Sequence, residues 1–99
     1  ITSTFCRASH NMAPYENSIF HFLIIFNRCI EKRENLTKDE WWDLNRICQL
    51  LEKKFKISGS TLLLRSGDWN YTGASVSHLH AHLIVGSGDP EKKVKARVG

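Results

Sequence analysis

Polar and apolar side chains alternate along residues 78–83, the polar ones are histidines, and an apolar run follows. Successive residues of a β-strand point to opposite faces, so His78, His80 and His82 would share one face, with neighbouring Cα atoms roughly 7 Å apart. The residues between and after them are apolar, and they would form a face that a core can bury: Leu79, Ala81, Leu83 and Val85. The pattern predicts a half-buried strand that presents a row of three imidazoles.

Residues 20–26 are almost uniformly apolar and predict a central strand that is covered on both faces. His21 is the single interruption. A buried imidazole needs hydrogen-bond partners, and a lone histidine in a core strand is more often structural than catalytic. Both a structural role and a supporting role at a site stay open for His21.

A helix is predicted from Thr37 onwards. Thr37 and Glu40 have the spacing of a capping box, and Lys53 and Lys54 suit the negative end of the helix dipole. Apolar residues recur at spacings of three and four, which predicts one core-facing stripe: Trp41, Leu44, Cys48, Leu51 and Phe55, widened by Ile47 and Leu50.

The remaining segments complete the expected fold. Residues 61–65 read as a strand, and residues 66–73 as a turn-rich loop that leads to the histidine strand. A further strand is expected before residue 20. Another is expected near 93–98, where basic and small apolar residues alternate as on an edge strand. We therefore expect one α+β domain over residues 1–99, an antiparallel sheet of about five strands with one long helix packed on a face.

Composition agrees with a globular domain, since 41% of the 99 residues are hydrophobic and 24% are charged. No apolar run approaches the 18 or so residues that cross a membrane, and no secretory signal is recognisable. Cys6, Cys29 and Cys48 are odd in number and far apart, which favours free thiols and a cytoplasmic location. Because the chain starts at Ile1 rather than Met, we expect the natural protein to have further terminal residues.

The net charge of +4 suits an anionic partner, either a phosphorylated small molecule or a nucleic acid. The basic residues are scattered, and they do not interleave with aromatic residues as a stacking platform for bases would. A phosphorylated small molecule is therefore the favoured partner, and a nucleic acid is not expected.

Three imidazoles on one face can supply a nucleophile, a proton carrier or a metal ligand. A His-x-His pair on a strand can give zinc two ligands, but no Asp, Glu or Cys follows at the short spacings that complete such a site. Cys6 and His10 form a second partial ligand set, which would need two more ligands from elsewhere. A partly buried thiol and a surface imidazole is the simpler interpretation of that pair.

The run of alternate histidines followed by apolar residues resembles the signature of the histidine triad (HIT) superfamily of nucleotide hydrolases and transferases. Its lead-in, Gly73-Ala74-Ser75-Val76-Ser77, is similar to that of the Hint-like and Fhit-like branches. Asn11-Met12-Ala13-Pro14 and the strand around His21 resemble the family's Asn-x-x-Pro turn and its histidine-containing strand. The resemblance covers roughly residues 10–86 and implies an α+β fold, commonly as a homodimer.

The resemblance also implies roles for the triad. His80 would attack the α-phosphorus of a nucleotide derivative and form a covalent nucleotidyl-histidine, which water then hydrolyses. A hydrogen bond from His80 to a backbone carbonyl at or near His78 would fix its tautomer. His78 would orient and support the ring, and His82 would contact phosphate oxygens or help to protonate the leaving group.

Outside the triad, the resemblance implies phosphate and leaving-group contacts from Ser75 and from the backbone near Gly73. Asn11 matches a position that contacts the ribose, and His21 a position beside the triad. The implied substrate is an AMP derivative, either a purine nucleoside phosphoramidate or a dinucleoside polyphosphate. No cofactor is required, although a divalent metal can accompany the substrate.

This chain also departs from the family pattern. Many relatives carry Asn or Gln about eleven residues before the first triad histidine, where this chain has Gly67, and Arg65, Asp68 or Asn70 are candidates to replace it. His82 stands where the hexose-1-phosphate uridylyltransferase branch has Gln, which favours a hydrolase. A dinucleoside polyphosphate phosphorylase and a non-catalytic nucleotide-binding or metal-binding protein stay open as alternatives.

Overall fold

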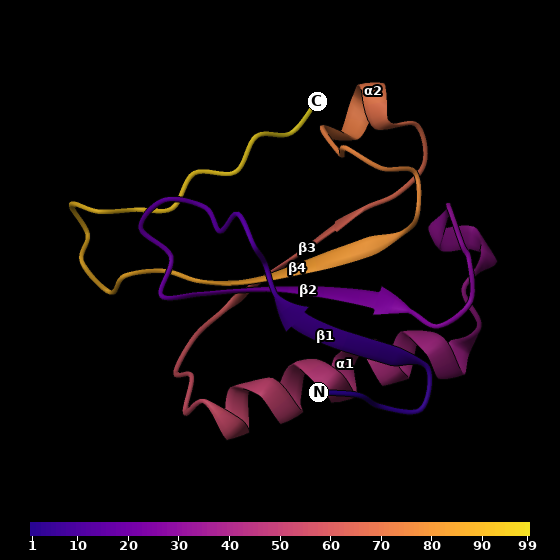
Figure 1. The fold of residues 1–99 in the computed structure, drawn as a ribbon, viewed down its shortest axis with the longest axis horizontal. Helices are drawn as coiled ribbons and strands as arrows, with labels where there is room; N and C mark the ends of the chain where they lie inside the picture. Colours follow the sequence, from indigo (N-terminus) through magenta and orange to yellow (C-terminus); the bar gives the residue numbers. More distant parts are fainter.

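The computed structural model describes residues 1–99, and its elements follow one another along the chain. They are β1 (Cys6–His10), β2 (Phe20–Phe26), the short 3-10 helix η1 (Arg33–Asn35), α1 (Lys38–Lys54), β3 (Thr61–Arg65), α2 (Trp69–Thr72) and β4 (His80–Val85). The strands form one sheet in the order β1-β2-β4-β3, and all neighbours are antiparallel. Figure 1 shows this sheet with α1 running along it. The α+β prediction is confirmed, with four strands instead of about five.

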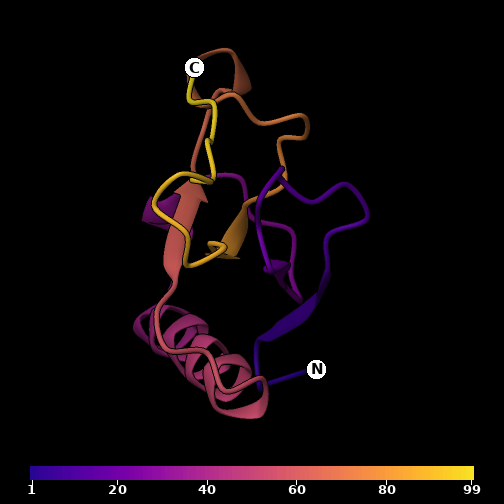
Figure 2. The ribbon, with the colours of Figure 1, turned by 90° about the vertical axis from the view of Figure 1, so that its left-hand side faces the viewer.

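The strand predicted near 93–98 is wrong, because that segment forms no ladder with the sheet. Val94 is its only partly buried residue, and Val98 is 68% exposed. Small apolar side chains between basic ones give the segment little surface to bury. The C-terminus instead lies beside α2, at the end of the molecule opposite α1 (Figure 2).

α1 begins as predicted. Thr37 Oγ1 accepts a hydrogen bond from the Glu40 N–H at 3.1 Å, and the Glu40 carboxylate accepts one from the Thr37 N–H at 3.0 Å. These reciprocal bonds satisfy two backbone donors that a helix N-terminus would otherwise leave unpaired. The capping box is therefore present.

The buried face of α1 differs from the predicted stripe, and consists of Glu40, Asp43, Leu44, Ile47, Cys48 and Leu51. Trp41 and Leu50, predicted to face the core, are 42% and 41% exposed. Two carboxylates can be buried here because they have partners far away in the sequence. Glu40 pairs with Arg28 at 2.7 Å, and Asp43 Oδ2 accepts bonds from the Ser3 hydroxyl and the Phe5 N–H.

The two faces of the sheet have different roles. The face toward α1 belongs to the hydrophobic core, which includes Phe22, Ile24, Phe26, Leu79, Ala81 and Leu83. On the opposite face, two rows cross the sheet: Ile25, His80 and Arg65 form one, and Leu23, His82 and Leu63 form the next. The prediction that core covers both faces of β2 is wrong on this side, where Leu23 and Ile25 line a cavity. We call this opposite side the histidine face.

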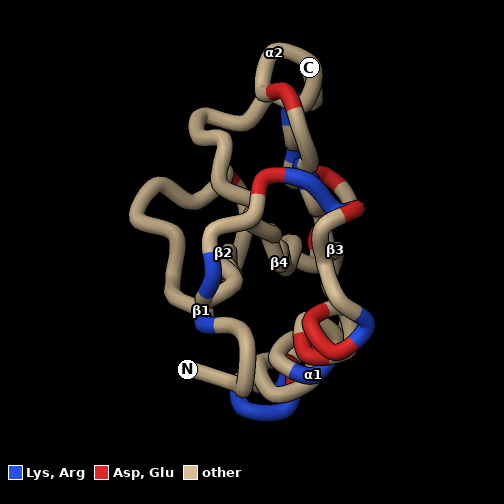
Figure 3. Tube along the Cα trace, turned by 90° about the vertical axis from the view of Figure 1, so that its right-hand side faces the viewer, with Lys and Arg blue, Asp and Glu red and all other residues tan.

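Charges are mixed along the chain. Figure 3 shows Lys and Arg positions interspersed with Asp and Glu positions around η1 and along α1. None of the helices has the length and apolar character that crossing a membrane requires.

Candidate active site

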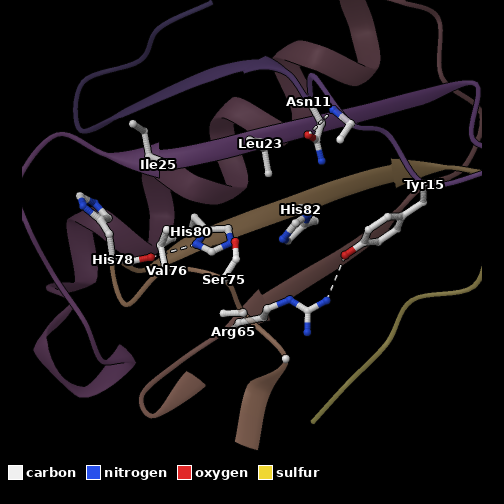
Figure 4. Close-up of a pocket in the computed structure, with 13 residues that line it drawn as sticks. Asn11, Tyr15, Leu23, Ile25, Arg65, Ser75, Val76, His78, His80 and His82 are labelled. Atoms are coloured by element: carbon white, nitrogen blue, oxygen red, sulfur yellow. Dashed lines mark hydrogen bonds between the residues drawn. The ribbon is translucent and has the colours of Figure 1, made fainter. Parts of the chain in front are cut away.

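A cavity of about 440 Å³ opens on the histidine face of the sheet. Its walls come from the turn at residues 11–15, from β2, from the end of β3 and from the segment 73–82. Figure 4 shows the polar side chains that it gathers: Asn11, Tyr15, Arg65, Ser75, His80 and His82. We refer to it as the triad cavity.

A hydrogen bond to the backbone orients the ring of His80. Its Nδ1 lies 2.9 Å from the carbonyl oxygen of His78, and a carbonyl can only accept a hydrogen bond. Nδ1 therefore carries a proton, and in the neutral form of the ring the lone pair is on Nε2. Because His80 lines the cavity, a neutral ring nitrogen is available there to attack an electrophile. The hydrogen bond predicted between His80 and this carbonyl is present.

A chain of hydrogen bonds fixes the tautomer of His82 as well. The Tyr15 N–H donates to His21 Nδ1 at 3.1 Å, so a neutral His21 carries its proton on Nε2. That Nε2 lies 2.8 Å from His82 Nδ1 and donates to it. The proton of His82 is therefore on Nε2, which is buried and has no partner within the protein. This leaves one buried N–H that lacks an acceptor in the free protein.

The rings of His21 and His82 are both neutral near pH 7. Burial, together with the neighbouring His80, His21 and Arg65, lowers the pKa of His82 to about 4. Burial also lowers the pKa of His21. A neutral imidazole N–H is a good hydrogen-bond donor but a weak acid, so His82 is suited to bind an oxygen in the free enzyme rather than to protonate it.

His78 differs from its predicted position. β4 begins at His80, so His78 lies in the approach to the strand. The Leu79 N–H donates to the Ile30 carbonyl, outside the sheet, which explains why the ladder starts later. In Figure 4 the ring of His78 lies apart from the rings of His80 and His82, whose centroids are 5.0 Å apart. All three histidines line the triad cavity, but only His80 and His82 lie on the strand, with their rings side by side, and His78 precedes it.

The other predicted site residues gather around this pair. Asn11, Ser75 and Gly73 line the triad cavity, while His21 lies behind His82 and does not. Gly73 has a φ of +74°, which favours glycine, and a Cβ there would lie 3.1 Å from Arg65 Nη1. A glycine is therefore required where the chain passes the end of β3.

Tyr15 was not predicted as a site residue. Its ring stacks on His82, with centroids 5.8 Å apart and an interplanar angle of 16°, and its centroid lies 4.3 Å from that of His21. The available signal was its place directly after the Asn-x-x-Pro turn. A turn does not reveal which strand it will fold against, so the contact could not be derived from that signal.

Arg65 was only one of three candidates for the missing Asn or Gln, and it is the one that lines the cavity. Its side chain is 8% exposed and donates hydrogen bonds to the Tyr15 hydroxyl at 3.0 Å and to the Thr72 carbonyl. Asp68 instead caps α2, where it accepts a bond from the Asn70 N–H. Asp68, Asn70 and Gly67 are not part of the lining.

Cys6 and His10 do not form a shared zinc site. They are four residues apart on β1, which separates their Cα atoms by about 13 Å, too far for both to bind one zinc ion. Burial and the nearby Asp43 raise the pKa of Cys6 to about 12, while the ring of His10 packs against Phe22. No group of three or more His, Cys, Asp or Glu side chains is placed to hold a metal. Independence of the reaction from metal stays a prediction.

The sequence matches the family model described as the HIT domain over residues 2–89. The chain belongs to this family. The resemblance inferred from the triad and its lead-in is thus confirmed. No curated protein gives a significant match to the chain.

Solved structures agree on the fold. A "Hit Like Protein" superposes with a TM-score of 0.73 at 22% identity, over 87% of this chain and 82% of that one. The diadenosine triphosphate hydrolase of Plasmodium falciparum, solved with Cyclomarin A, superposes with a TM-score of 0.72 at 19% identity. The alignment covers 97% of this HIT chain but 63% of the Plasmodium enzyme. At these identities the likeness shows a shared fold.

Proposed function

We propose that this HIT protein is a nucleotide hydrolase or nucleotidyl transferase that cleaves an AMP derivative at its α-phosphate through a covalent nucleotidyl-histidine. The observation that carries the proposal is the pair of fixed tautomers in the triad cavity. A neutral His80 has its lone pair on Nε2, and the neighbouring His82 has on its Nε2 an N–H that lacks an acceptor within the protein. A nucleophile beside a hydrogen-bond donor suits attack on a phosphoryl group, which gains negative charge on its oxygens in the transition state.

The proposed reaction has two steps. The lone pair of His80 Nε2 forms a bond to the α-phosphorus, and the bond from phosphorus to the leaving group breaks with its electron pair. In the second step the oxygen of water attacks phosphorus, the P–N bond breaks, and its electrons return to Nε2. The water gives its proton to solvent or to the departing imidazole. His82 donates a hydrogen bond to a phosphate oxygen in both steps.

The shape of the cavity supports a nucleotide substrate. Leu23, Ile25 and Val76 give it apolar surface that suits a nucleobase, and Asn11 and Ser75 give it polar groups for a ribose and a phosphate. The Plasmodium relative is named as a diadenosine triphosphate hydrolase, which is consistent with this class of substrate.

Two alternatives share this cavity. A phosphorylase would use inorganic phosphate in place of water in the second step, and a non-catalytic protein would bind the nucleotide without turnover. The cytoplasmic location, the homodimer and the absence of a required cofactor remain part of the proposal. Unchanged turnover in the presence of a chelator is the expected sign of a metal-free reaction.

The test compares wild-type protein with His80→Asn on AMP phosphoramidates and dinucleoside polyphosphates, with water or phosphate as the acceptor. Denaturing mass spectrometry would look for a trapped nucleotidyl adduct. We expect turnover and an adduct in the wild type, and a loss of both in the variant. His10→Asn is the matched control, because that histidine lies on β1 away from the cavity and should retain turnover.

Equal turnover in wild type and His80→Asn would contradict the mechanism. Binding of AMP with no turnover on any substrate would favour the non-catalytic alternative. Release of a nucleoside diphosphate only when phosphate is present would identify a phosphorylase.

A further inference from the structure

Arg65 brings a buried positive charge to the wall of the triad cavity. It is the last residue of β3 and pairs in register with His80 on β4, so the two side chains project from the same face of the sheet. Only 8% of its surface is exposed. Figure 4 shows the side chain extending along the cavity from β3 toward Tyr15.

The guanidinium has no carboxylate partner. Its two acceptors, the Tyr15 hydroxyl and the Thr72 carbonyl, are both neutral, and the one salt bridge of the structure joins Arg28 to Glu40 instead. Burying a charge without an opposite charge is unfavourable. Two of its five N–H groups are used, which leaves three for another acceptor. An anion bound in the cavity would supply both the missing charge and the missing acceptor.

The side chains that face Arg65 do not supply that negative charge. His80 and His82 are the titratable side chains opposite it on β4, and a histidine is neutral or positive. Tyr15 contributes a hydroxyl, and Thr72 and Gly73 contribute backbone. The backbone of Arg97 and of the terminal Gly99 also lies close to Gly73 on this side of Arg65. The positive charge of Arg65 acts on the neighbouring His82, where it contributes to the lowered pKa of that ring.

We propose that Arg65 selects substrates whose leaving group is itself a phosphate, so that the preferred class is the dinucleoside polyphosphates rather than nucleoside phosphoramidates. The inference rests on the proposed function and narrows its substrate. When His80 Nε2 bonds to the α-phosphorus, the P–O bond of the anhydride breaks and its electron pair stays on the departing oxygen. The N–H groups of Arg65 stabilise that charge, and the leaving group departs without needing a proton.

An amine leaving group has the opposite requirement. When a P–N bond of a phosphoramidate breaks, the electron pair stays on nitrogen, which must take up a proton to leave as a neutral amine. A nearby guanidinium cannot give this proton, because arginine stays protonated in proteins. The neutral His82 is also a weak acid. The residues of this cavity therefore suit an anionic leaving group better.

The test measures kcat/KM for diadenosine triphosphate and for adenosine 5′-phosphoramidate with wild type, Arg65→Gln and Arg65→Lys. Gln keeps an amide that can bond to Tyr15 and Thr72 but removes the charge, whereas Lys keeps the charge. We expect Arg65→Gln to lower kcat/KM for the polyphosphate by roughly 10- to 100-fold, the usual effect of a lost charged hydrogen bond, and to change the phosphoramidate far less. Arg65→Lys should retain most of the preference.

Tyr15→Phe is the matched control for the local hydrogen bond. It removes one acceptor from Arg65 but leaves the charge, so the ratio of the two kcat/KM values should stay near that of the wild type. If the ratio of kcat/KM for the polyphosphate to kcat/KM for the phosphoramidate is the same in Arg65→Gln as in the wild type, the proposal is overturned. Arg65 would then have a purely structural role. Inorganic pyrophosphate should also inhibit phosphoramidate turnover by the wild type competitively, and a lack of inhibition would count against the proposal even if the Gln variant failed to fold.

The same assays keep the two proposals apart. Retained activity of His80→Asn on both substrates would overturn the proposed function. A different result would reject only the role of Arg65. In that case His80→Asn is inactive, as the mechanism requires, but Arg65→Gln lowers kcat/KM equally for both substrates.

Discussion

At the scale of single residues, the candidate site depends on where each imidazole keeps its proton. The His78 carbonyl and the Tyr15 N–H are backbone groups with only one possible role each, so they fix the tautomers of three rings. Backbone groups cannot titrate between pH 4 and 9. The lowered pKa values of His21 and His82 keep these two rings neutral near pH 7, so their donors and acceptors stay as these backbone groups set them.

His21 is expected to act as a positioning residue, because it contacts His82 and does not line the cavity. In His21→Phe the Nδ1 of His82 loses its donor, and the ring is free to adopt the other tautomer. We expect kcat to fall by roughly 10- to 100-fold with a smaller change in KM. A loss of this size is typical when a side chain that donates hydrogen bonds or transfers protons at the reacting group is no longer held in place.

His21→Gln is the matched variant, because its amide can still donate to His82. It should recover part of the lost kcat. An equal loss in both variants, accompanied by an equal loss of thermal stability, would instead show that His21 serves only the packing of the strand.

The pH dependence of stability provides a second test at this scale. His82 has a pKa of about 4 when folded and an ordinary value of 6.5 when unfolded, so the unfolded state binds a proton first as the pH falls. The stabilisation is fully present above pH 6.5 and is lost on going down to pH 4. We expect the free energy of unfolding to drop by about 3 kcal/mol over that interval from His82 alone.

Urea titrations at several pH values would measure this change, with His82→Asn as the comparison that removes the group. For each protein the free energy of unfolding is plotted against pH. The difference between the two plots is the contribution of His82, because carboxylates that titrate in the same range contribute to both. Identical pH dependence in the two proteins would mean that folding does not lower the pKa of His82.

At the scale of elements, the start of α1 is set by Thr37 and Glu40. In Thr37→Ala the Glu40 N–H loses its acceptor, and we expect the free energy of unfolding to fall by about 1 kcal/mol. Ser58→Ala, at an exposed position after the helix, is the control and should change little. A loss of similar size in both variants in chemical denaturation would contradict the role of the cap.

Local patterns explain which elements could be predicted. The capping box and the alternation before Val85 are signals contained within a few residues, and α1 and β4 are present. The contents of the cavity depend on partners brought together by the sheet: Arg65 meets Tyr15 across 50 positions, and His21 meets His82 across 61. Spacing along the chain carries no information about such pairs. The apolar pattern marked His21 as an interruption, but only the family resemblance placed it beside the triad.

The wrong predictions for Trp41 and for residues 93–98 have related causes. Trp41 fits the helical period, but its predicted place is taken by carboxylates whose partners, Arg28 and Ser3, lie outside the helix. The tail near 93–98 has strand periodicity, but it lacks side chains large enough to anchor it to the sheet. A periodic pattern shows that a face exists, whereas burial depends on what the rest of the chain places against that face.

At the scale of the whole molecule, the predicted homodimer can be tested from the surface next to α1. β3 lies at an edge of the sheet, and Leu62 on it is 47% exposed. Trp41 on α1 is 42% exposed and lines the same groove as Leu62. An edge strand beside exposed large apolar side chains is typical of a surface that a partner covers.

Sedimentation equilibrium on the wild type should therefore give the mass of two chains. Leu62→Asp and Trp41→Asp should each shift the equilibrium toward one chain, because a carboxylate buried in the interface would have no partner. Met12→Asp is the matched control, since Met12 is 97% exposed and lies on the turn beside the cavity, away from α1. A wild type that sediments as one chain at every concentration would contradict the dimer. If both Leu62→Asp and Trp41→Asp remain dimers, the interface lies on another face. The exposed Trp42 on α1 would then be the next residue to replace.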